Sequence, residues 1–168
     1  TDVVQAWLDS GADANSPTDA QGRTPLYAAC EHGHVDAVRL LLDKGAAVNR
    51  ATENGATPLG IAQKKGHSSI VALLEEHIYR LHAAAKTGDV DAMARFLDGG
   101  AEVDRADKDG RTPLYLACLK GHVDAARLLL DNGAEVDRAE EDGWTPLSTA
   151  KYKGHSSIVA RLEEHMYR

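Results

Sequence analysis

The chain has 168 residues, of which 43% are hydrophobic but only 5% aromatic, so its core has to be assembled from alanine, leucine and valine, side chains that suit closely stacked helices. Its 26 acidic and 19 basic residues leave a net charge of −7 with both signs mixed along the chain, which argues against a nucleic-acid partner, because phosphates require a clustered basic surface. No apolar run reaches the length of about 18 residues that a membrane span needs, and two isolated cysteines fit a reducing, cytoplasmic location.

An internal repeat runs along the chain. The tripeptide Thr-Pro-Leu begins at Thr24, Thr57, Thr112 and Thr145, at successive spacings of 33, 55 and 33 residues. A Gly-His pair follows nine residues after each of these threonines. Such a period is typical of repeat architectures, whose units stack because none of them can bury its apolar face alone. The pattern predicts that each unit consists of a turn, a short helix, a glycine turn and a second helix.

The segment 18–50 shows the physical basis of one unit. Residues 19–22 form a tight turn, and Thr24 stands where an N-cap is needed, directly before a proline that suits the first helical position. The first helix is predicted over 25–32 and the second over about 35–44, where apolar residues recur on one face. A glycine follows each helix and ends it. Both helices are short and amphipathic, so their stability has to come from neighbouring units.

This pattern resembles the ankyrin repeat, and the resemblance rests on DAQGRTPLYAACEHGHVDAVRLLLDKGAAVN, with related segments over nearly the whole chain. It implies an all-α solenoid of antiparallel helix pairs with projecting hairpin loops. It also implies a non-catalytic protein–protein interaction module, whose partner protein is bound at the hairpin tips and on the concave face of the inner helices. The family's motif has histidine where Tyr27 and Tyr115 stand, so the hairpin contacts of that histidine are in doubt, and only His82 keeps it.

The chain also contains a larger duplication. The segment GHSSIVALLEEHIYR at 66–80 matches GHSSIVARLEEHMYR at 154–168 in 13 of 15 positions. We therefore predict two tandem near-duplicate modules, 1–80 and 81–168, of which the first begins with an incomplete unit. Polar residues at Gln63 and Lys151, in the last unit of each module, suggest ends that face water.

The joint between the modules lacks the hairpin that separates other units. Residues 68–87 contain no glycine or proline and are rich in helix formers, so one continuous helix over 68–87 is predicted. The alternative is a kinked solenoid in which the chain from Leu81 onward stacks on the preceding helix pair. With a continuous helix, the incomplete module ends could associate with other copies of the chain.

No group of residues has the arrangement that catalysis requires. Cys30 and Cys118 are each followed four residues later by His34 and His122, but a glycine turn intervenes, so both thiols are interpreted as small core residues. The Gly-His histidines provide only one side chain per repeat, whereas a zinc site needs three or four converging ligands. We expect no catalytic, metal-binding or cofactor-binding residues.

The positions that folding does not require are where partner recognition is expected. Trp144 is the foremost of them, because a large exposed aromatic side chain on a hairpin is typical of binding hot spots. Packing on an adjacent hairpin is the alternative interpretation of Trp144. The predicted partner-binding residues are Arg23, Tyr27, Glu31, His32, Asn54, Lys64, Lys65, Lys108, Asp109, Arg111, Tyr115, Leu119, Lys120, Trp144, Tyr152 and Lys153. The alternative function is a structural one, self-assembly through the incomplete module ends into a head-to-tail or swapped oligomer.

Overall fold

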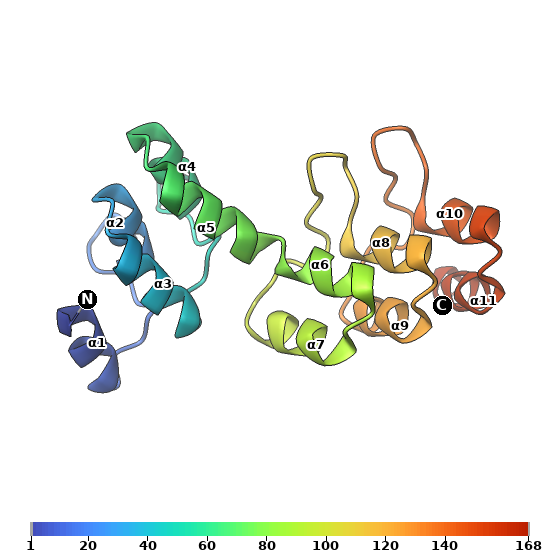
Figure 1. Ribbon diagram of the computed structural model, residues 1–168, viewed down its shortest axis with the longest axis horizontal. Coiled ribbons are helices and arrows are strands. Elements are labelled where there is room, and N and C mark those ends of the chain that lie inside the picture. Colours follow the sequence, from blue (N-terminus) through green and yellow to red (C-terminus); the bar gives the residue numbers. More distant parts are fainter. Residues whose placement is uncertain (1, 168) are drawn as a thin grey trace. The chain divides into compact units, whose positions relative to one another are not determined.

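The computed structural model describes residues 2–167, with side chains from residue 4 onward, and this part of the chain forms eleven α-helices and no strand (Figure 1). The all-α repeat fold is therefore confirmed. The helices are Asp2–Asp9 (α1), Pro25–Glu31 (α2), Val35–Asp43 (α3), Pro58–Lys65 (α4), Ser68–Ile78 (α5), Arg80–Thr87 (α6), Val90–Asp98 (α7), Pro113–Lys120 (α8), Val123–Asp131 (α9), Pro146–Lys153 (α10) and Ser156–Met166 (α11).

The chain divides into two compact units, Thr1–Ile78 and Tyr79–Arg168, which we call unit 1 and unit 2. The division falls two residues before the predicted module boundary. Each unit has its own core of buried aliphatic side chains.

In unit 1, the inner helices α2 and α4 pack side by side, and the outer helices α3 and α5 form a second layer packed against them. The core between the layers contains Leu26, Leu41, Ile70 and Leu74, each at most 1% exposed. Side chains of α1 pack against the same core from the N-terminal end of the unit. The unit is thus built from two complete helix pairs and one single helix.

Unit 2 contains three complete helix pairs. The inner helices α6, α8 and α10 stack in that order, and the outer helices α7, α9 and α11 form a second layer packed against them. Its core includes Leu81, Met93, Leu114 and Leu129, which are almost fully buried. Leu129 occupies the same repeat position in unit 2 as Leu41 does in unit 1.

The helix starts follow the sequence chemistry closely. The side chains of Thr24, Thr57, Thr112 and Thr145 each accept a hydrogen bond from a backbone N–H one turn into the helix, and a proline occupies the first turn each time. The predicted N-caps are confirmed. Ser148 adds to the cap at Thr145, because its hydroxyl oxygen accepts a hydrogen bond from the backbone N–H of Thr145. The two bonds together form a capping box.

Backbone contacts join the hairpins of neighbouring repeats. The Glu141 N–H donates to the carbonyl of Asp109 at 3.3 Å, and the Glu53 N–H donates to the carbonyl of Gln21 at 3.1 Å. Gly110 sits at one of these junctions with a φ of 76°, and a Cβ on it would lie only 2.9 Å from the Glu141 nitrogen. A glycine is therefore required there, both for its backbone conformation and for the close approach of the next hairpin.

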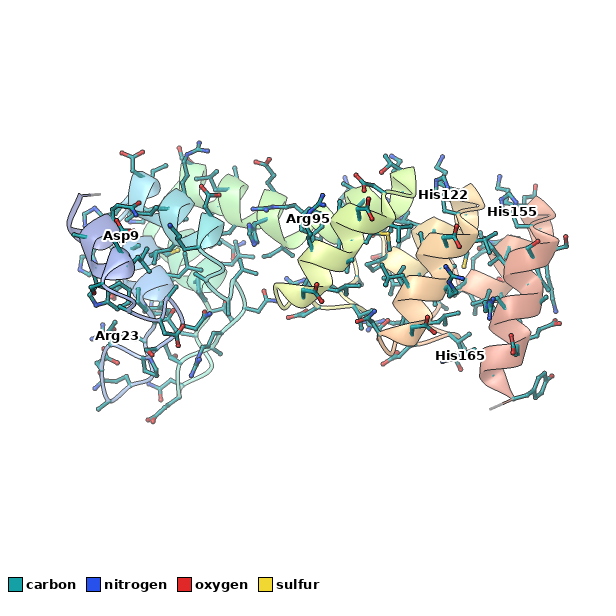
Figure 2. The ribbon with its side chains drawn as sticks, turned by 90° about the horizontal axis from the view of Figure 1, so that it is seen from below. Asp9, Arg23, Arg95, His122, His155 and His165 are labelled. Carbon is teal, nitrogen blue, oxygen red and sulfur yellow. The ribbon has the colours of Figure 1, made fainter. Side chains whose placement is uncertain are left out.

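The Gly-His turns join neighbouring repeats at their other end. His122 Nε2 donates to the carbonyl of Lys86 at 3.1 Å, and its ring covers Gly88, where a Cβ would lie 2.7 Å from Nδ1. His67 bonds the carbonyl of Glu31 in the same way at 3.3 Å. His122 and His155 mark successive turns in unit 2 (Figure 2). The predicted structural role of His67 and His122, bonding backbone, is confirmed.

The single helix predicted over 68–87 is wrong, because the structure divides this segment into α5 and α6. Tyr79 interrupts it with φ −94° and ψ 8°, and its carbonyl begins the hydrogen bonding of α6. Leu74 belongs to the core of unit 1 and Leu81 to the core of unit 2. The segment is rich in helix formers and has no glycine or proline, but propensity is a weak preference that packing into two different cores overrides.

Candidate functional site

An exposed aromatic pair lies where the last hairpin meets the last inner helix of unit 2. Trp144 closes the hairpin, since its backbone N–H donates a hydrogen bond to the Glu140 carboxylate at 3.0 Å. Tyr152 lies in the last turn of α10, and the two rings meet edge to face with their centres 5.3 Å apart. Trp144 remains 42% exposed and Tyr152 73% exposed. The Tyr152 ring is also approached by Lys153, whose ammonium lies 5.5 Å from the ring centre.

This pair, which we call the aromatic corner, has the features of an anchoring site. Exposed aromatic surface gains free energy when a partner covers it, and two rings held edge to face lose little conformational freedom on binding. The hydrogen bond from Trp144 to Glu140 fixes the backbone beneath the indole. The corner is thus preorganised and accessible.

The neighbouring hairpin of unit 2 carries a compact ion network. The Arg111 guanidinium contacts Asp107 at 3.0 Å and also pairs with Asp109. Partial burial raises the pKa of Asp107, but the N–H groups of Arg111 and Asp109 and the Arg111 side chain outweigh it and leave the pKa below its usual value. Arg111 and Asp109 are therefore engaged with each other, while Lys108 at the tip stays exposed.

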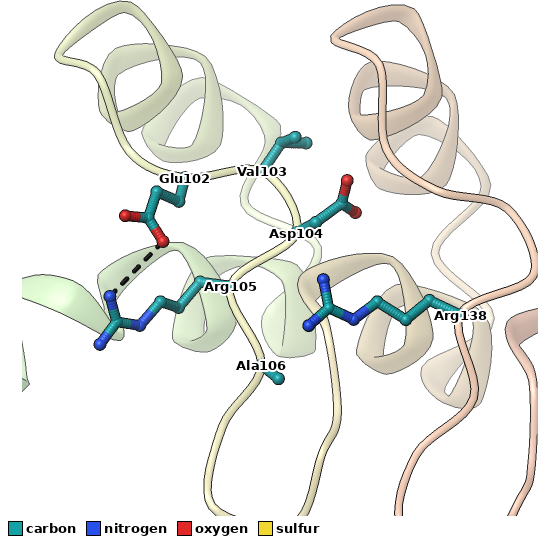
Figure 3. Close-up of a pocket in the computed structure, with 6 residues that line it drawn as sticks. All are labelled: Glu102, Val103, Asp104, Arg105, Ala106 and Arg138. Atoms are coloured by element: carbon teal, nitrogen blue, oxygen red, sulfur yellow. Dashed lines mark hydrogen bonds and ion pairs between the residues drawn. The ribbon is translucent and has the colours of Figure 1, made fainter.

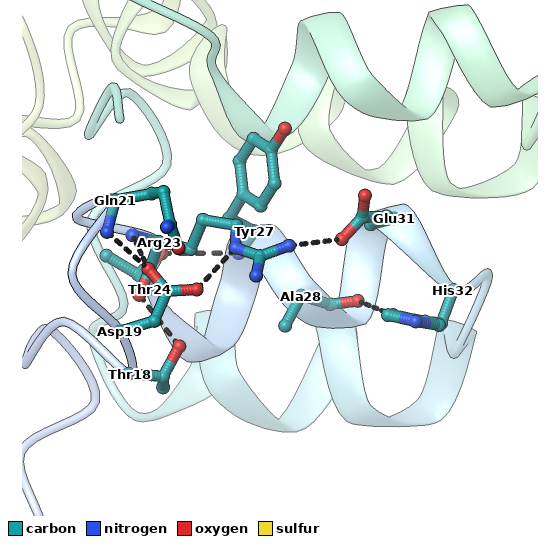
Figure 4. Close-up of polar contacts among 9 residues, drawn as sticks. All are labelled: Thr18, Asp19, Gln21, Arg23, Thr24, Tyr27, Ala28, Glu31 and His32. Atoms are coloured by element: carbon teal, nitrogen blue, oxygen red, sulfur yellow. Dashed lines mark hydrogen bonds and ion pairs between the residues drawn. The ribbon is translucent and has the colours of Figure 1, made fainter. Parts of the chain in front are cut away.

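The corresponding hairpin of unit 1 has a similar network around Arg23 (Figure 4). Arg23 pairs with Asp19 on its own hairpin and reaches Glu31 on α2 at 3.2 Å. Beside it, a shallow groove of about 330 Å³ is lined by Gln21, Arg23, Tyr27, Thr52, Asn54 and Ala56. Three predicted residues, Arg23, Tyr27 and Asn54, are thus brought together in one groove.

The remaining predicted residues are distributed along the inner helices. Leu119 and Lys120 end α8, and Lys64 and Lys65 end α4 with both side chains exposed. His32 follows α2, where its Nδ1 bonds the carbonyl of Ala28 at 2.9 Å. These residues occupy the same end of successive inner helices in each unit.

Tyr27 and Tyr115 differ from the other predicted contacts because they are buried. Their exposed fractions are 7% and 9%, and each sits in the first turn of an inner helix. They offer a partner little surface and act mainly in packing. Sequence alone did not separate them from exposed positions, because both stand where the family's motif has a polar histidine.

A cavity that was not predicted from the sequence lies at the base of the hairpins in unit 2 (Figure 3). It has a volume of about 570 Å³ and is lined by Glu102, Val103, Asp104, Arg105, Ala106 and Arg138. Its charges are largely satisfied locally, because Arg105 pairs with Glu102 at 3.4 Å and Asp104 accepts the N–H of Glu135. The arginine that follows Val-Asp in both repeats was the available signal.

Comparison with known families decides the identity of this fold. A model of ankyrin repeats, built from three copies, matches residues 1–79 and again residues 81–167. The chain belongs to the ankyrin repeat family. Ankyrin repeats generally mediate protein–protein interaction and are typically non-catalytic.

Curated relatives share short stretches of ankyrin repeats with the chain. It is 50% identical over 52 residues to the 2-5A-dependent ribonuclease of Mus musculus, 41% identical over 55 residues to an ankyrin repeat-containing protein of Schizosaccharomyces pombe, and 43% identical over 56 residues to the tyrosine-protein kinase HTK16 of Hydra vulgaris. The matches cover 31%, 33% and 32% of this chain, and 7%, 26% and 7% of those proteins. The chain thus spans only a small part of each relative's length.

The residues with reactive side chains are placed as structural elements of an ankyrin stack. Cys30 and Cys118 are free and fully buried, and burial raises the pKa of each thiol to about 12. Their predicted core position is confirmed. Within the described residues, no three His, Cys, Asp or Glu side chains gather as metal ligands. None of the helices in this part of the chain is long and apolar enough to cross a membrane.

Proposed function

We propose that the chain binds a partner protein through unit 2, on the surface formed by its last hairpin and the exposed ends of its inner helices. The aromatic corner of Trp144 and Tyr152 is the observation that carries this proposal. Aromatic residues are enriched among binding hot spots, and replacing one typically costs about 2 kcal/mol or more of binding free energy. Among the large apolar side chains of the described residues, these two are exposed together and in mutual contact.

The rest of the surface supports the same role. Leu119 and Lys120 at the end of α8 lie on the helix that packs against α10, so they extend the corner along the stack. Lys108 and Asp109 add charged groups on the hairpin before it. An apolar centre with a charged surround is the usual composition of a protein-binding surface.

The experiment is affinity capture with the full chain and its single-residue variants. Trp144→Ala and Tyr152→Ala are each expected to reduce recovery of the bound protein at least tenfold, since about 1.4 kcal/mol corresponds to a factor of ten. Trp7→Ala is the matched control, because Trp7 on α1 is exposed to a similar extent, 37%, far along the sequence from the corner. Equal recovery with all three variants contradicts the proposal.

The self-assembly alternative is association through the incomplete module ends, and one surface at the end of unit 1 is a candidate for it. In unit 1, a shallow groove of about 390 Å³ lies on α4 and α5 and is lined by Gln63, Gly66, Ser68, Val71, Ala72 and Glu75. At the equivalent place in unit 2, Lys151 and Glu163 form an ion pair at 2.8 Å. We infer that a second copy of the chain would use the groove of unit 1. Light scattering over a wide concentration range tests this, and a mass of one chain throughout contradicts it.

A further inference from the structure

The chain contains four asparagines, and two of them directly precede a glycine, at Asn54-Gly55 and Asn132-Gly133. An asparagine in this position is chemically labile, because glycine has no Cβ to shield its backbone nitrogen from the side-chain amide before it. The two asparagines have very different surroundings. Asn54 lies at the tip of the hairpin between α3 and α4, whereas Asn132 is the C-cap of α9.

Asn132 is held by the end of its helix. Its Nδ2 donates to the carbonyl of Leu128 at 2.8 Å, and the N–H of the glycine after it donates to the carbonyl of Leu130 at 3.0 Å. The buried Ala134 follows and donates its N–H to the carbonyl of Leu129. Opening the backbone at Asn132 would break these bonds and expose Ala134, so the fold protects this asparagine.

The hairpin turn of Asn54 lacks a contact that closes the other three hairpin turns. In each of those turns, one carboxylate accepts the backbone N–H of the residues two and four positions further on. These carboxylates belong to Asp19, Asp107 and Glu140. Thr52 has the equivalent position, and its hydroxyl accepts the N–H of Ala56 alone, at 3.1 Å. Within the described residues, no side chain therefore bonds the backbone N–H of Asn54.

The tip around Asn54 can open without disturbing the rest of the hairpin. The Asn54 side chain is exposed, and its amide has no hydrogen-bond partner among the described residues. The Gly55 N–H donates to the carbonyl of Thr52 at 2.9 Å, and nothing lies within 4 Å of the place that a Cβ on Gly55 would take. Below the tip, the Thr52 N–H still donates to the carbonyl of Ala56. Local opening here breaks few contacts and costs little free energy.

We infer that Asn54 is a site of spontaneous deamidation, selected by the open turn of its hairpin. The Gly55 nitrogen gives its proton to hydroxide and attacks Cγ of Asn54. A new C–N bond closes a cyclic imide, the bond from Cγ to Nδ2 breaks, and Nδ2 takes a proton from water and leaves as ammonia. Water then opens the imide at one of its two carbonyls, which yields aspartate or isoaspartate.

The product changes the groove of unit 1, because Asn54 lines this groove together with Arg23. The reaction adds a negative charge to a groove whose guanidinium is already paired with Asp19 and Glu31. Isoaspartate also lengthens the main chain by a methylene group, which an exposed hairpin tip can accommodate. The reaction is independent of the partner that unit 2 binds.

Mass spectrometry of the incubated full chain tests the inference. Trypsin cleaves after lysine and arginine, which places the four asparagines on four separate peptides. During incubation at mildly alkaline pH, peptide 51–64 is expected to gain the mass that separates an acid from an amide at least about tenfold faster than peptide 128–138. Equal rates at Asn54 and Asn132, or a faster reaction at Asn132, overturn the inference.

The chain unfolded in guanidinium chloride is the control for intrinsic reactivity. Both asparagines precede glycine, so the two peptides are expected to gain mass at similar rates once the fold is lost. Similar rates in the unfolded chain, together with selectivity for Asn54 in the folded chain, support the inference. A preference for Asn54 that persists unchanged in the unfolded chain overturns it, because the hairpin turn would then have no part in the selection.

Two variants locate the cause in the hairpin. Thr52→Asp supplies the acceptor that the other turns have, and is expected to slow the reaction of Asn54 at least about threefold through the added hydrogen bond. An unchanged rate, with folding verified by circular dichroism, overturns the inference. Asn54→Gln places at the tip the residue that Gln21 provides in the first hairpin, and peptide 51–64 should then keep its mass. A mass gain at the original rate would come from Gln63 and would exclude Asn54 as the site.

Discussion

The two units are built on the same scaffold but differ in what they expose. A shift of 88 positions relates them, and under it the helix cap Thr24 corresponds to Thr112 and the buried Cys30 to Cys118. Several positions that are exposed in unit 2 hold different residues in the two units. Ala56 corresponds to Trp144, and the solvent-facing Lys64 corresponds to Tyr152.

The difference shows that folding and recognition use separate sets of positions in this chain. Caps, glycine turns and stacked leucines are shared because each helix pair needs them to close on its neighbour. The inner-helix ends and hairpins carry no such requirement, so Glu31 and Leu119 can occupy one position in two copies without cost to the fold. Recognition is therefore expected to belong to one unit and stability to both.

Removing a core leucine should have the largest effect and should affect the two units alike. Leu41 and Leu129 occupy the same repeat position and are almost fully buried. Leu41→Ala and Leu129→Ala are each expected to lower the free energy of unfolding by about 3 kcal/mol, because burial is lost and a cavity is left behind. Urea denaturation followed by circular dichroism measures this. A loss below about 1 kcal/mol at either position would mean that the unit relaxes around the cavity or is not packed as described.

Grafting the aromatic corner onto unit 1 should create a second anchoring site. The double variant Ala56→Trp and Lys64→Tyr places the same two side chains at the equivalent positions. In a chain whose own corner is removed by Trp144→Ala, the graft is expected to recover part of the lost binding, of order 1–2 kcal/mol. No recovery would mean that the aromatic pair needs its unit 2 neighbours, such as Lys120 and Lys153.

The helix caps should contribute equally in both units. Thr24→Ala and Thr112→Ala each remove a buried hydroxyl that accepts one backbone N–H, at a cost of about 1 kcal/mol. Both threonines are nearly fully buried, so water cannot replace the lost bond. Thermal melting of the two variants is expected to show similar shifts in Tm. Shifts that differ by more than a factor of two would mean that the caps do not contribute equally in the two units.

The buried His82 should give unit 2 a small dependence on pH. Burial lowers the pKa of His82 in the folded state, opposed by weaker contributions from the hairpin backbone and Asp107. The unfolded chain then binds a proton that the folded chain does not, so stability is retained above the ordinary histidine pKa and falls as the pH drops below it, by at most about 1.4 kcal/mol per pH unit.

His82→Tyr isolates this effect, because tyrosine occupies the same repeat position in α2 and α8. Measured at several pH values between neutral and acidic, the unfolding free energy of the wild-type chain should fall relative to that of His82→Tyr as the pH falls. Parallel curves would show that His82 does not titrate differently in the two states.

The fold was largely predictable from the sequence because the same helix-start and turn residues recur in each repeat. Threonine before Pro-Leu marks a helix start, and glycine marks each turn, so Thr57 and Thr145 could be placed without a structure. The break at Tyr79 could not, since no local residue encodes it and it follows from packing into two cores. The same limit explains the aromatic corner, where the sequence indicated Trp144 and Tyr152 as partner-binding residues but could not give the contact between their rings.

Amide hydrogen exchange of the full chain, with and without its captured partner, tests the central claim most directly. The account predicts slower exchange on binding at residues 140–153 and in the last turn of α8, with residues 53–65 of unit 1 unchanged. Protection confined to unit 1, with 140–153 unaffected, would contradict it.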